Sequence, residues 1–453
     1  MSRTDVSSPP GSAYTTYVLV TLLLAYILSF IDRNVLAMLV GPIRQQFDIS
    51  DFQFSILHGW AFTLFYIFLG LPIGWLADRY SRKWIITGGV FFWSLMTCLC
   101  GLAGSFYALF VTRVGVGVGE AALSPPAYSM MADYFSARRL RWATSVFTLG
   151  ITIGSGTSYM IGGSVYDYLE ANPIGTITGI EWLVSISAWQ ATFIAVGLPG
   201  LIVVLMLLAI KEPQRQGRSA RRGSDGQGSE LIGWLRSHWQ VYFSLVFGVS
   251  MMAVIGYGTL TWYPEFLQRS YAMPRTEAGQ ALGWIFLIAG SAGTLSGAFF
   301  AERLQARGYL DANMRMVMLA AAILIVPAAA APLMPSADLA ILLTWPIIFV
   351  HYTHFGVAMA ALNVITPNHM RAQISALMLF STNLFGLALG GSFVAFFTDF
   401  VYAGDEHLNY SLATVAAIVY PLAVITIAFG LSYYRNSLKE QGLDELSDPP
   451  TPL

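Results

Sequence analysis

Charged side chains are scarce in this sequence: Asp, Glu, Lys and Arg make up 11% of its 453 residues, whereas a soluble domain carries about 25%. The 24 basic and 25 acidic residues nearly balance, so no basic surface for a nucleic acid is expected. The two cysteines, Cys98 and Cys100, fall within one apolar run, where residues two apart point to different sides of a helix. They therefore predict neither a disulfide nor a metal pair. These shortages exclude a soluble globular enzyme, a disordered chain and a disulfide-rich secreted domain.

Hydrophobic residues are abundant, at 56%, and gather into long runs. A helix needs roughly 20 mostly apolar residues to cross a bilayer. Twelve runs reach this length, so we predict an all-α membrane protein with 12 transmembrane helices. The predicted spans are 14–40, 53–77, 84–103, 105–132, 140–168, 187–210, 237–263, 278–301, 311–334, 339–366, 370–398 and 408–434.

Basic residues outside these spans indicate the orientation. If the N-terminus is cytoplasmic, all of them lie on the cytoplasmic side except Arg44, Arg269 and Arg275. Cytoplasmic loops of membrane proteins carry an excess of Lys and Arg. We therefore predict that both termini are cytoplasmic (N-in, C-in).

A polar, basic segment rich in Gly and Ser follows the sixth span and divides the chain. We predict a cytoplasmic tail (1–13), a six-helix bundle (14–210), a flexible cytoplasmic linker (211–236), a second six-helix bundle (237–436) and a second cytoplasmic tail (437–453). The halves repeat weakly, since Gly74 to Lys83 resembles Gly297 to Arg303. This favours two bundles related by pseudo-two-fold symmetry, an architecture common in secondary transporters.

Four charged residues lie well inside the predicted spans, and all are in the first half. Asp32 and Arg33 belong to the first span, and Arg113 and Glu120 to the fourth. A charge inside the bilayer is costly, by about 2.5–3.5 kcal/mol on insertion scales, and is functional by default. One interpretation is a set of permanent ion pairs that tie helices together. The interpretation we favour is that Asp32 and Glu120 exchange protons while Arg33 and Arg113 hold an anion.

The second half contributes polar rather than charged candidates. His351 and His354 are three apart on one helix face of the tenth span, and Asn363 follows in the same span. We expect these three side chains to line a cavity for substrate, with His58 as a weaker candidate. No carboxylate accompanies the two histidines in that span, so we predict no metal site.

A longer motif now identifies the superfamily. The segment Gly74-x-Leu76-x-Asp78-Arg79-x-x-Arg82-Lys83 is similar to the loop signature of major facilitator superfamily transporters, except that Ser81 stands where that signature usually has glycine. With Asp32-Arg33, the span-four text from Thr112 to Ala121 and Ala132-Asp133-Tyr134-Phe135, the chain resembles the spinster-like lipid transporters of that superfamily.

The resemblance implies the MFS fold, rocking between inward-open and outward-open states, and export of lysophospholipids or sphingosine-phosphate-like lipids. It assigns proton coupling to Asp32 and Glu120 and head-group contact to Arg33 and Arg113. The signature also predicts a conformational latch, formed by Gly74, Asp78, Arg79, Arg82, Lys83 and Asp133. A carboxylate at the N-terminus of a helix is favoured by the helix dipole, so we expect Asp78 to approach the start of span eleven near Thr366 or Asn368. Arg82 is expected to hold Asp78 or Asp133.

Other functions remain open at this stage. One alternative is a proton symporter of a small organic anion or a sugar. Two others are an intramembrane enzyme acting on lipid, for which no nucleophile, base or metal set is found beyond His351 and His354, and a lipid sensor that transports nothing. We expect a non-enzymatic monomer in a bacterial inner membrane, with an amphipathic lipid as substrate, membrane lipids as neighbours, and protons but no cofactor.

Overall fold

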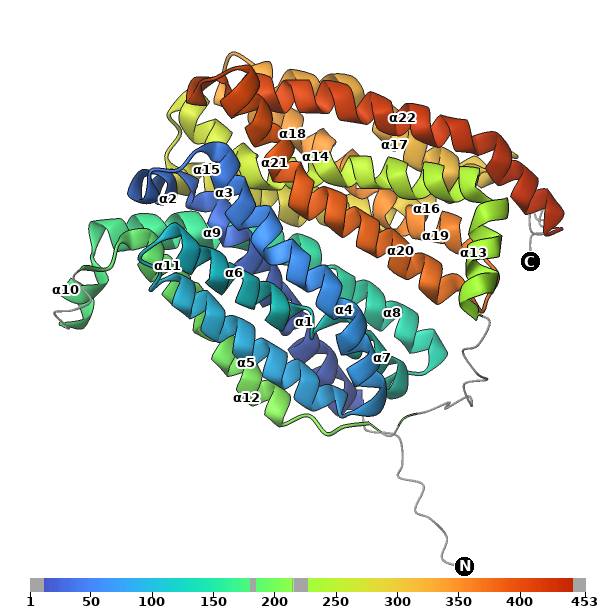
Figure 1. Ribbon diagram of the computed structural model, residues 1–453, viewed down its shortest axis with the longest axis horizontal. Coiled ribbons are helices and arrows are strands. Elements are labelled where there is room, and N and C mark those ends of the chain that lie inside the picture. The colour runs from blue at the N-terminus through green and yellow to red at the C-terminus, as the bar shows by residue number, and fades with distance from the viewer. Residues whose placement is uncertain (1–11, 180–184, 214, 216–226, 443–453) are drawn as a thin grey trace, which may run out of the picture.

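The computed structural model describes residues 12–179, 185–213, 215 and 227–442, and these residues form helices and no strand. Figure 1 shows the helices of the first half on one side of the molecule and those of the second half on the other. Most of the two predicted tails, and much of the predicted linker, lie outside the described residues.

The first half begins with a long helix that ends in a tighter turn. Helix α1 runs into a 3₁₀ segment, Val35–Met38, directly after the charged pair Asp32 and Arg33. The helices of this half are α1 (Ser12–Asn34), α2 (Val40–Phe47), α3 (Asp51–Ser55), α4 (Ala61–Arg79), α5 (Arg82–Cys100), α6 (Phe106–Glu120), α7 (Ser124–Tyr134), α8 (Ala137–Thr148), α9 (Gly150–Ala171), α10 (Ile174–Thr178), α11 (Ala188–Gly197) and α12 (Pro199–Leu208).

The second half is built around two helices, α14 and α22, that pack along each other. Its helices are α14 (Trp239–Tyr271), α15 (Arg275–Trp284), α16 (Ser291–Ala306), α17 (Ala312–Ala330), α18 (Ala337–Tyr352), α19 (His354–Ile365), α20 (Arg371–Asn383), α21 (Gly390–Phe396) and α22 (Leu408–Glu440). Before them comes α13 (Gln227–Ser237). The C-terminal end of the predicted linker is therefore helical.

Eleven helical segments of the described chain are long and apolar enough to cross a membrane, and they match eleven of the twelve predicted spans. The exception is the fifth span, which the structure forms as α8 and α9. Many residues of α9 are Gly, Ser or Thr, and this lowers its hydropathy. The helix packs against α1 on one side and α15 on the other, so small residues suit its position. The twelve-span count and the orientation stay predictions.

The two halves approach each other most closely where glycines face the opposite backbone. A Cβ built on Gly59 would lie 2.5 Å from the carbonyl oxygen of Leu387, and one on Gly156 would lie 2.6 Å from that of Gly283. Both crossings therefore require glycine. Gly59 and Leu387 lie in π-helical segments, Ile56–Trp60 and Leu384–Leu389, a local irregularity that is frequent at functional sites.

Hydrogen bonds between the halves gather toward one end of the molecule, which we call the Asp51 end. They include Ser55 to Ser392 (2.9 Å), Tyr159 to the carbonyl of Leu260 (2.5 Å) and Thr276 to Asp167 (2.6 Å). The opposite end, which we call the Arg82 end, carries the start of α5, the end of α12 and the last turns of α22 (Figure 1). In this conformation the halves are thus joined at the Asp51 end.

Candidate functional site

The four charges predicted to cluster do lie together. Arg33 Nη2 donates to Glu120 Oε2 at 2.7 Å, so the first and fourth spans are joined by an ion pair. Arg113 lies beside it and donates from Nη1 to the carbonyl oxygen of Asp32 at 3.1 Å. None of the four residues is more than 4% exposed. In this conformation they are shielded from solvent, so any exchange with water requires a second conformation or a local opening.

The ion pair lies at the boundary between the halves. Three aromatic rings of the first half surround the guanidinium group of Arg33, with Phe30, Phe62 and Tyr66 at 4.7, 4.5 and 5.1 Å from ring centroid to Cζ. From the second half, the side chain of Tyr257 on α14 interacts with Arg33. A charged pair within an aromatic shell offers polar and apolar contacts at one place.

The hydrogen bonds of Arg113 go to the backbone of α1. Its Nη1 and Nη2 atoms donate to the carbonyl oxygens of Asp32 and Arg33, at 3.1 and 3.4 Å. These carbonyls belong to the last turn of α1, where the α-helical hydrogen-bond pattern gives way to the 3₁₀ segment. Ser158 donates to the neighbouring carbonyl of Ile31 at 3.3 Å. Arg113 therefore caps the helix that presents Asp32 and Arg33, a contribution that the sequence pattern did not reveal.

Asp32 points into the first half. Its side chain lies beside Trp93 and Thr97 of α5, yet Asp32 Oδ1, Trp93 Nε1 and Thr97 Oγ1 are all buried without a hydrogen-bond partner in the described chain. Burial of an ionised carboxylate is unfavourable unless it is paired and hydrogen-bonded. Glu120 thus forms an ion pair with Arg33, whereas no such pair is found for Asp32 among the described residues.

The predicted polar residues of the second half lie apart from this pair. His351 is buried with Nδ1 at 3.1 Å from the Tyr420 hydroxyl, and its ring packs against Gly256 of α14. His354 Nδ1 contacts the carbonyl oxygen of His351, and Asn363 accepts from Ser375 at 3.3 Å. The contacts found for these three residues are with their own half. His58 instead reaches across, with Nδ1 at 3.2 Å from Thr261.

The loop signature forms an ionic group at the Arg82 end. Arg82, which is 2% exposed, donates to Asp133 as expected, and to Glu212 at 2.9 Å. Lys83 Nζ donates to the carbonyl oxygen of Leu208 at 2.7 Å, and Arg79 lies over the Trp75 ring at 3.6 Å.

The predicted start of the span-eleven helix, which Asp78 was expected to approach, is wrong. The helix of span eleven, α20, begins at Arg371 with Met370 as its N-cap, and not at Thr366 or Asn368. Thr366 instead hydrogen-bonds to Tyr242 at 2.8 Å. A Cβ built on Gly74 would meet nothing within 4 Å, so this glycine is not packed closely here. The assignment of a latch stays a prediction.

The residues just after the sixth span hold this loop, and sequence reasoning missed them. Glu212 accepts from the Lys83 backbone N–H at 2.8 Å and from the Ser81 hydroxyl at 2.7 Å, besides Arg82. Burial raises the pKa of Glu212, but these hydrogen bonds outweigh it and leave the pKa below its usual value. Arg215 donates to the carbonyl oxygens of Ala77 and Tyr80, both at 2.7 Å, and also contacts that of Asp78. These contacts cap the end of α4.

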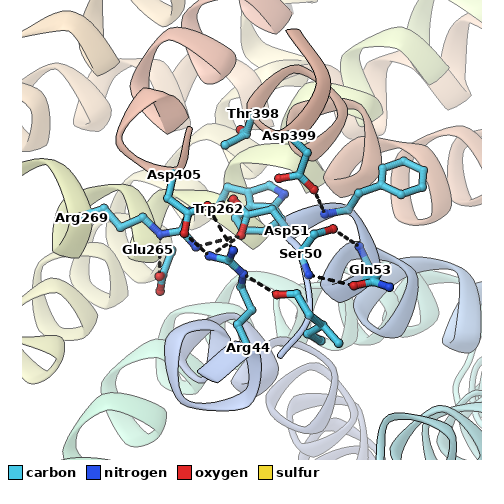
Figure 2. A network of polar contacts seen from close by, with 12 residues as sticks. Arg44, Ser50, Asp51, Gln53, Trp262, Glu265, Arg269, Thr398, Asp399 and Asp405 are labelled. Carbon is cyan, nitrogen blue, oxygen red and sulfur yellow. Dashed lines mark hydrogen bonds and ion pairs between the residues drawn. The ribbon is translucent and has the colours of Figure 1, made fainter. Parts of the chain in front are cut away.

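A second ionic group, at the Asp51 end, was also missed (Figure 2). Arg269 binds Asp51 with both terminal nitrogens, at 2.7 and 2.8 Å. Arg44 binds Asp405 in the same way, at 2.8 and 3.1 Å. Carboxylate oxygens of Asp51, Asp399 and Asp405 lie within 4.8 Å of one another, and the two guanidinium groups supply compensating charge. In the sequence, Arg44 and Arg269 stand out only as exceptions to the excess of basic residues on the predicted cytoplasmic side.

Comparison with known proteins finds similarity along most of the chain. The model of the Major Facilitator Superfamily matches residues 22–395. An MFS-type efflux pump of Mycolicibacterium smegmatis is 24% identical over 91% of this chain and 92% of its own length. Protein spinster homolog 1 of Xenopus laevis is 27% identical over 87% of this chain and 75% of its own. A bacterial homolog of the human lysosomal transporter spinster, solved in an inward-facing and occupied conformation, superposes with a TM-score of 0.77 at 27% identity, covering 98% of this chain and all of that one.

Proposed function

This chain belongs to the Major Facilitator Superfamily and is a spinster-like transporter rather than an enzyme, and we propose that it exports amphipathic anionic lipids by proton-coupled alternating access. The proposed cargo is a lysophospholipid or a sphingosine-phosphate-like lipid, and the proposed site of action is a bacterial inner membrane. Protons are the coupling ion and no cofactor takes part.

The observation that carries this proposal is the Arg33–Glu120 pair within its aromatic shell. A guanidinium group binds a phosphate in bidentate fashion, and the rings of Phe30, Phe62 and Tyr66 offer contact to an acyl chain. The same guanidinium holds the carboxylate of Glu120 at 2.7 Å. A phosphate can take this position only if Glu120 gives it up, and protonation of Glu120 makes that exchange favourable. Anion loading is thereby linked to uptake of a proton at Glu120, so the lipid and the proton cross the membrane in the same direction and the outward gradient of the lipid drives export.

Asp32 and Arg113 have supporting parts in this scheme. Asp32 carries a second proton, since its buried carboxylate lacks the direct cationic partner that Glu120 has. Arg113 adds positive charge to the cluster while it caps α1. His351, His354 and Asn363 are proposed to line the second half of the path. In the rocking motion these residues approach the head group only in a conformation other than the one described.

The junction at the Asp51 end supports the alternating part of the proposal. If the termini are cytoplasmic, this end faces outward, and the conformation is closed to the outside. The bacterial spinster homolog that superposes on this chain is described as inward-facing, which agrees with that interpretation. The latch residues Gly74, Asp78, Arg79, Arg82, Lys83 and Asp133 would then act in the opposite, outward-open state.

Flux into liposomes tests the proposal. Purified protein should move a lysophospholipid or sphingosine phosphate under an imposed pH gradient, and Asp32→Asn and Glu120→Gln should each lower that flux at least ten-fold while the protein stays folded. Glu277→Gln, a change at an exposed acidic residue of α15, is the matched control and should leave flux unchanged. Wild-type flux from Glu120→Gln would remove its coupling role. Competition by a small organic anion or a sugar, but not by lysolipids, would favour the symporter alternative.

A further inference from the structure

Asp51 is the centre of the ionic group at the Asp51 end. It is the first residue of α3 and is 0% exposed, although it lies where the two halves meet. Its carboxylate receives two hydrogen bonds from Arg269 of α14, in the other half. The neighbouring backbone N–H of Phe52 donates to Asp399, also of the other half, at 2.7 Å. The start of α3 is thus held by the second half as well as by its own.

Each arginine in this group has a close partner in its own half and one in the opposite half (Figure 2). Arg269 also lies 3.9 Å from Asp405 of its own half. Arg44 lies 3.1 Å from Asp51 in its own half and 2.8 Å from Asp405 across the boundary. Arg269 lies 2.8 Å from Glu265, one turn earlier on α14, and 2.7 Å from Asp51 across the boundary. If the halves separate, the two pairs across the boundary break and the pairs within a half remain.

This arrangement removes the usual obstacle to opening a buried ion pair. Removal of one partner from such a pair is strongly destabilising because an uncompensated buried charge is left behind. Here Arg44 stays with Asp51, and Arg269 stays with Glu265. Asp405 loses Arg44 but stays 3.9 Å from Arg269 of its own half, and as the most exposed member, at 56% of its side-chain surface, it can be solvated by water. Separation of the halves therefore leaves no buried charge without a partner.

We propose that Arg44, Asp51, Glu265, Arg269 and Asp405 form a charge-exchange lock that closes the Asp51 end, in which Glu265 is the partner that Arg269 keeps when the lock opens. The lock rests on the alternating opening of the proposed function, but on neither its substrate nor its proton coupling. Glu265 is a positioning residue: its oxygens face α2, 3.6 Å from a Cβ built on Gly41, and it holds Arg269 in place for Asp51.

The lock predicts opposite effects for two acidic residues that bind the same arginine. Asp51 binds Arg44 in both states but Arg269 only in the closed state, so its neutralisation removes a pair across the boundary and favours opening. Glu265 binds Arg269 at 2.8 Å in both states, and after opening only Asp405, at 3.9 Å, remains beside that arginine as well. Neutralisation of Glu265 therefore removes no pair across the boundary, penalises the open state more and favours closure. A merely structural ion-pair cluster would respond in the same direction to both changes.

The test measures the distance between spin labels at two exposed positions of opposite halves, Gln45 and Asp338, in full-length protein without substrate and with Cys98 and Cys100 replaced by alanine. We expect Asp51→Asn to raise the ratio of open to closed molecules about ten-fold or more, which corresponds to about 1.4 kcal/mol. Asp405→Asn should raise it less, because Asp405 is exposed. Adding Glu265→Gln to Asp405→Asn should then lower the ratio about three-fold. Glu277→Gln is the matched control and should change nothing.

Two results would overturn the lock. If Glu265→Gln opens this end as Asp51→Asn does, or leaves the distances unchanged in the Asp405→Asn background, charge exchange is wrong. If neither Asp405→Asn nor Arg269→Gln lengthens the distance, the ionic group does not close this end; Arg269→Gln also replaces Asp51→Asn should that variant fail to fold. Because no substrate or pH gradient is used, these failures are distinct from a failure of lipid export.

Discussion

Replacement of Arg113 separates two explanations of why a charge is kept inside the fourth span. In one, the guanidinium group touches the head group of the cargo. In the other, it caps α1 and thereby holds Asp32 and Arg33 in position. Arg113→Gln removes the charge and both hydrogen bonds, whereas Arg113→Lys keeps the charge with a side chain that cannot reproduce the fork geometry.

The expected loss of stability follows from the contacts. Arg113 is 0% exposed and donates to two buried carbonyl oxygens, at 3.1 and 3.4 Å. A buried acceptor left without its donor costs about 1–3 kcal/mol, and the longer bond contributes little. The formal charges of Asp32, Arg33, Arg113 and Glu120 sum to zero, so Arg113→Gln also leaves one buried negative charge uncompensated. Together these effects predict a loss of about 2–4 kcal/mol for Arg113→Gln, and about half of that for Arg113→Lys.

Equilibrium unfolding in mixed detergent micelles, followed by tryptophan fluorescence, measures this loss. The control is Arg303→Gln, since Arg303 is exposed and lies over the Phe299 ring at 4.9 Å, and its replacement should stay within about 0.5 kcal/mol of wild type. Binding of lysophosphatidic acid is measured in parallel. If Arg113→Gln is no less stable than Arg303→Gln yet loses lipid binding, the capping explanation is refuted and the guanidinium contacts the cargo.

Two further predictions concern the ends of the molecule. Burial raises the pKa of Glu212, but hydrogen bonds from Lys83, Ser81 and Arg82 outweigh this and lower the pKa below its ordinary value. The ionised Glu212 carboxylate therefore stabilises the folded protein above the ordinary pKa, and this stabilisation is lost as the pH falls through the lowered pKa. The stability difference between wild type and Glu212→Gln should shrink as the pH falls below 4.5, the ordinary pKa of glutamate, and a difference independent of pH would contradict the role. Gly59→Ala should lengthen the label distance at the Asp51 end, because its Cβ would lie 2.5 Å from a backbone oxygen, whereas Gly88→Ala, where a Cβ meets nothing within 4 Å, should not.

The sequence predicted the helical class, eleven of the membrane-length helices and the meeting of the first and fourth spans, because these depend on local composition. A charge in an apolar run is visible without any knowledge of the fold, and two such runs have reason to neutralise each other. The direction in which each side chain points is a different matter. That Arg113 turns to the end of α1, or that Asp32 faces α5, depends on how three helices pack, and no spacing within one helix encodes it.

The two ionic groups at the ends were missed for a related reason. Arg44, Asp51, Arg269 and Asp405 stand at helix ends, where charged residues are common and signal orientation. Only the contact between α3 and the second half brings them together, across more than 200 residues of sequence. Glu212 was overlooked because the segment after the sixth span has the composition of a flexible linker, although its first residues bind the loop before α5.

The proposed cycle makes different demands on the two groups of charges at the boundary. Arg33 and Glu120 belong to one half, so rigid-body motion of the halves leaves their bond intact. The lock joins opposite halves, so the same motion must break it. Chemistry at Glu120 can therefore influence the lock through contacts that cross the boundary near the pair, such as Tyr257 beside Arg33 and Thr261 beside His58. Both residues lie on α14, whose last turns carry Glu265 and Arg269. Twelve residues of helix, about 18 Å, separate Tyr257 from Arg269, and α14 is thus the continuous element by which a proton at Glu120 can bias the Asp51 end.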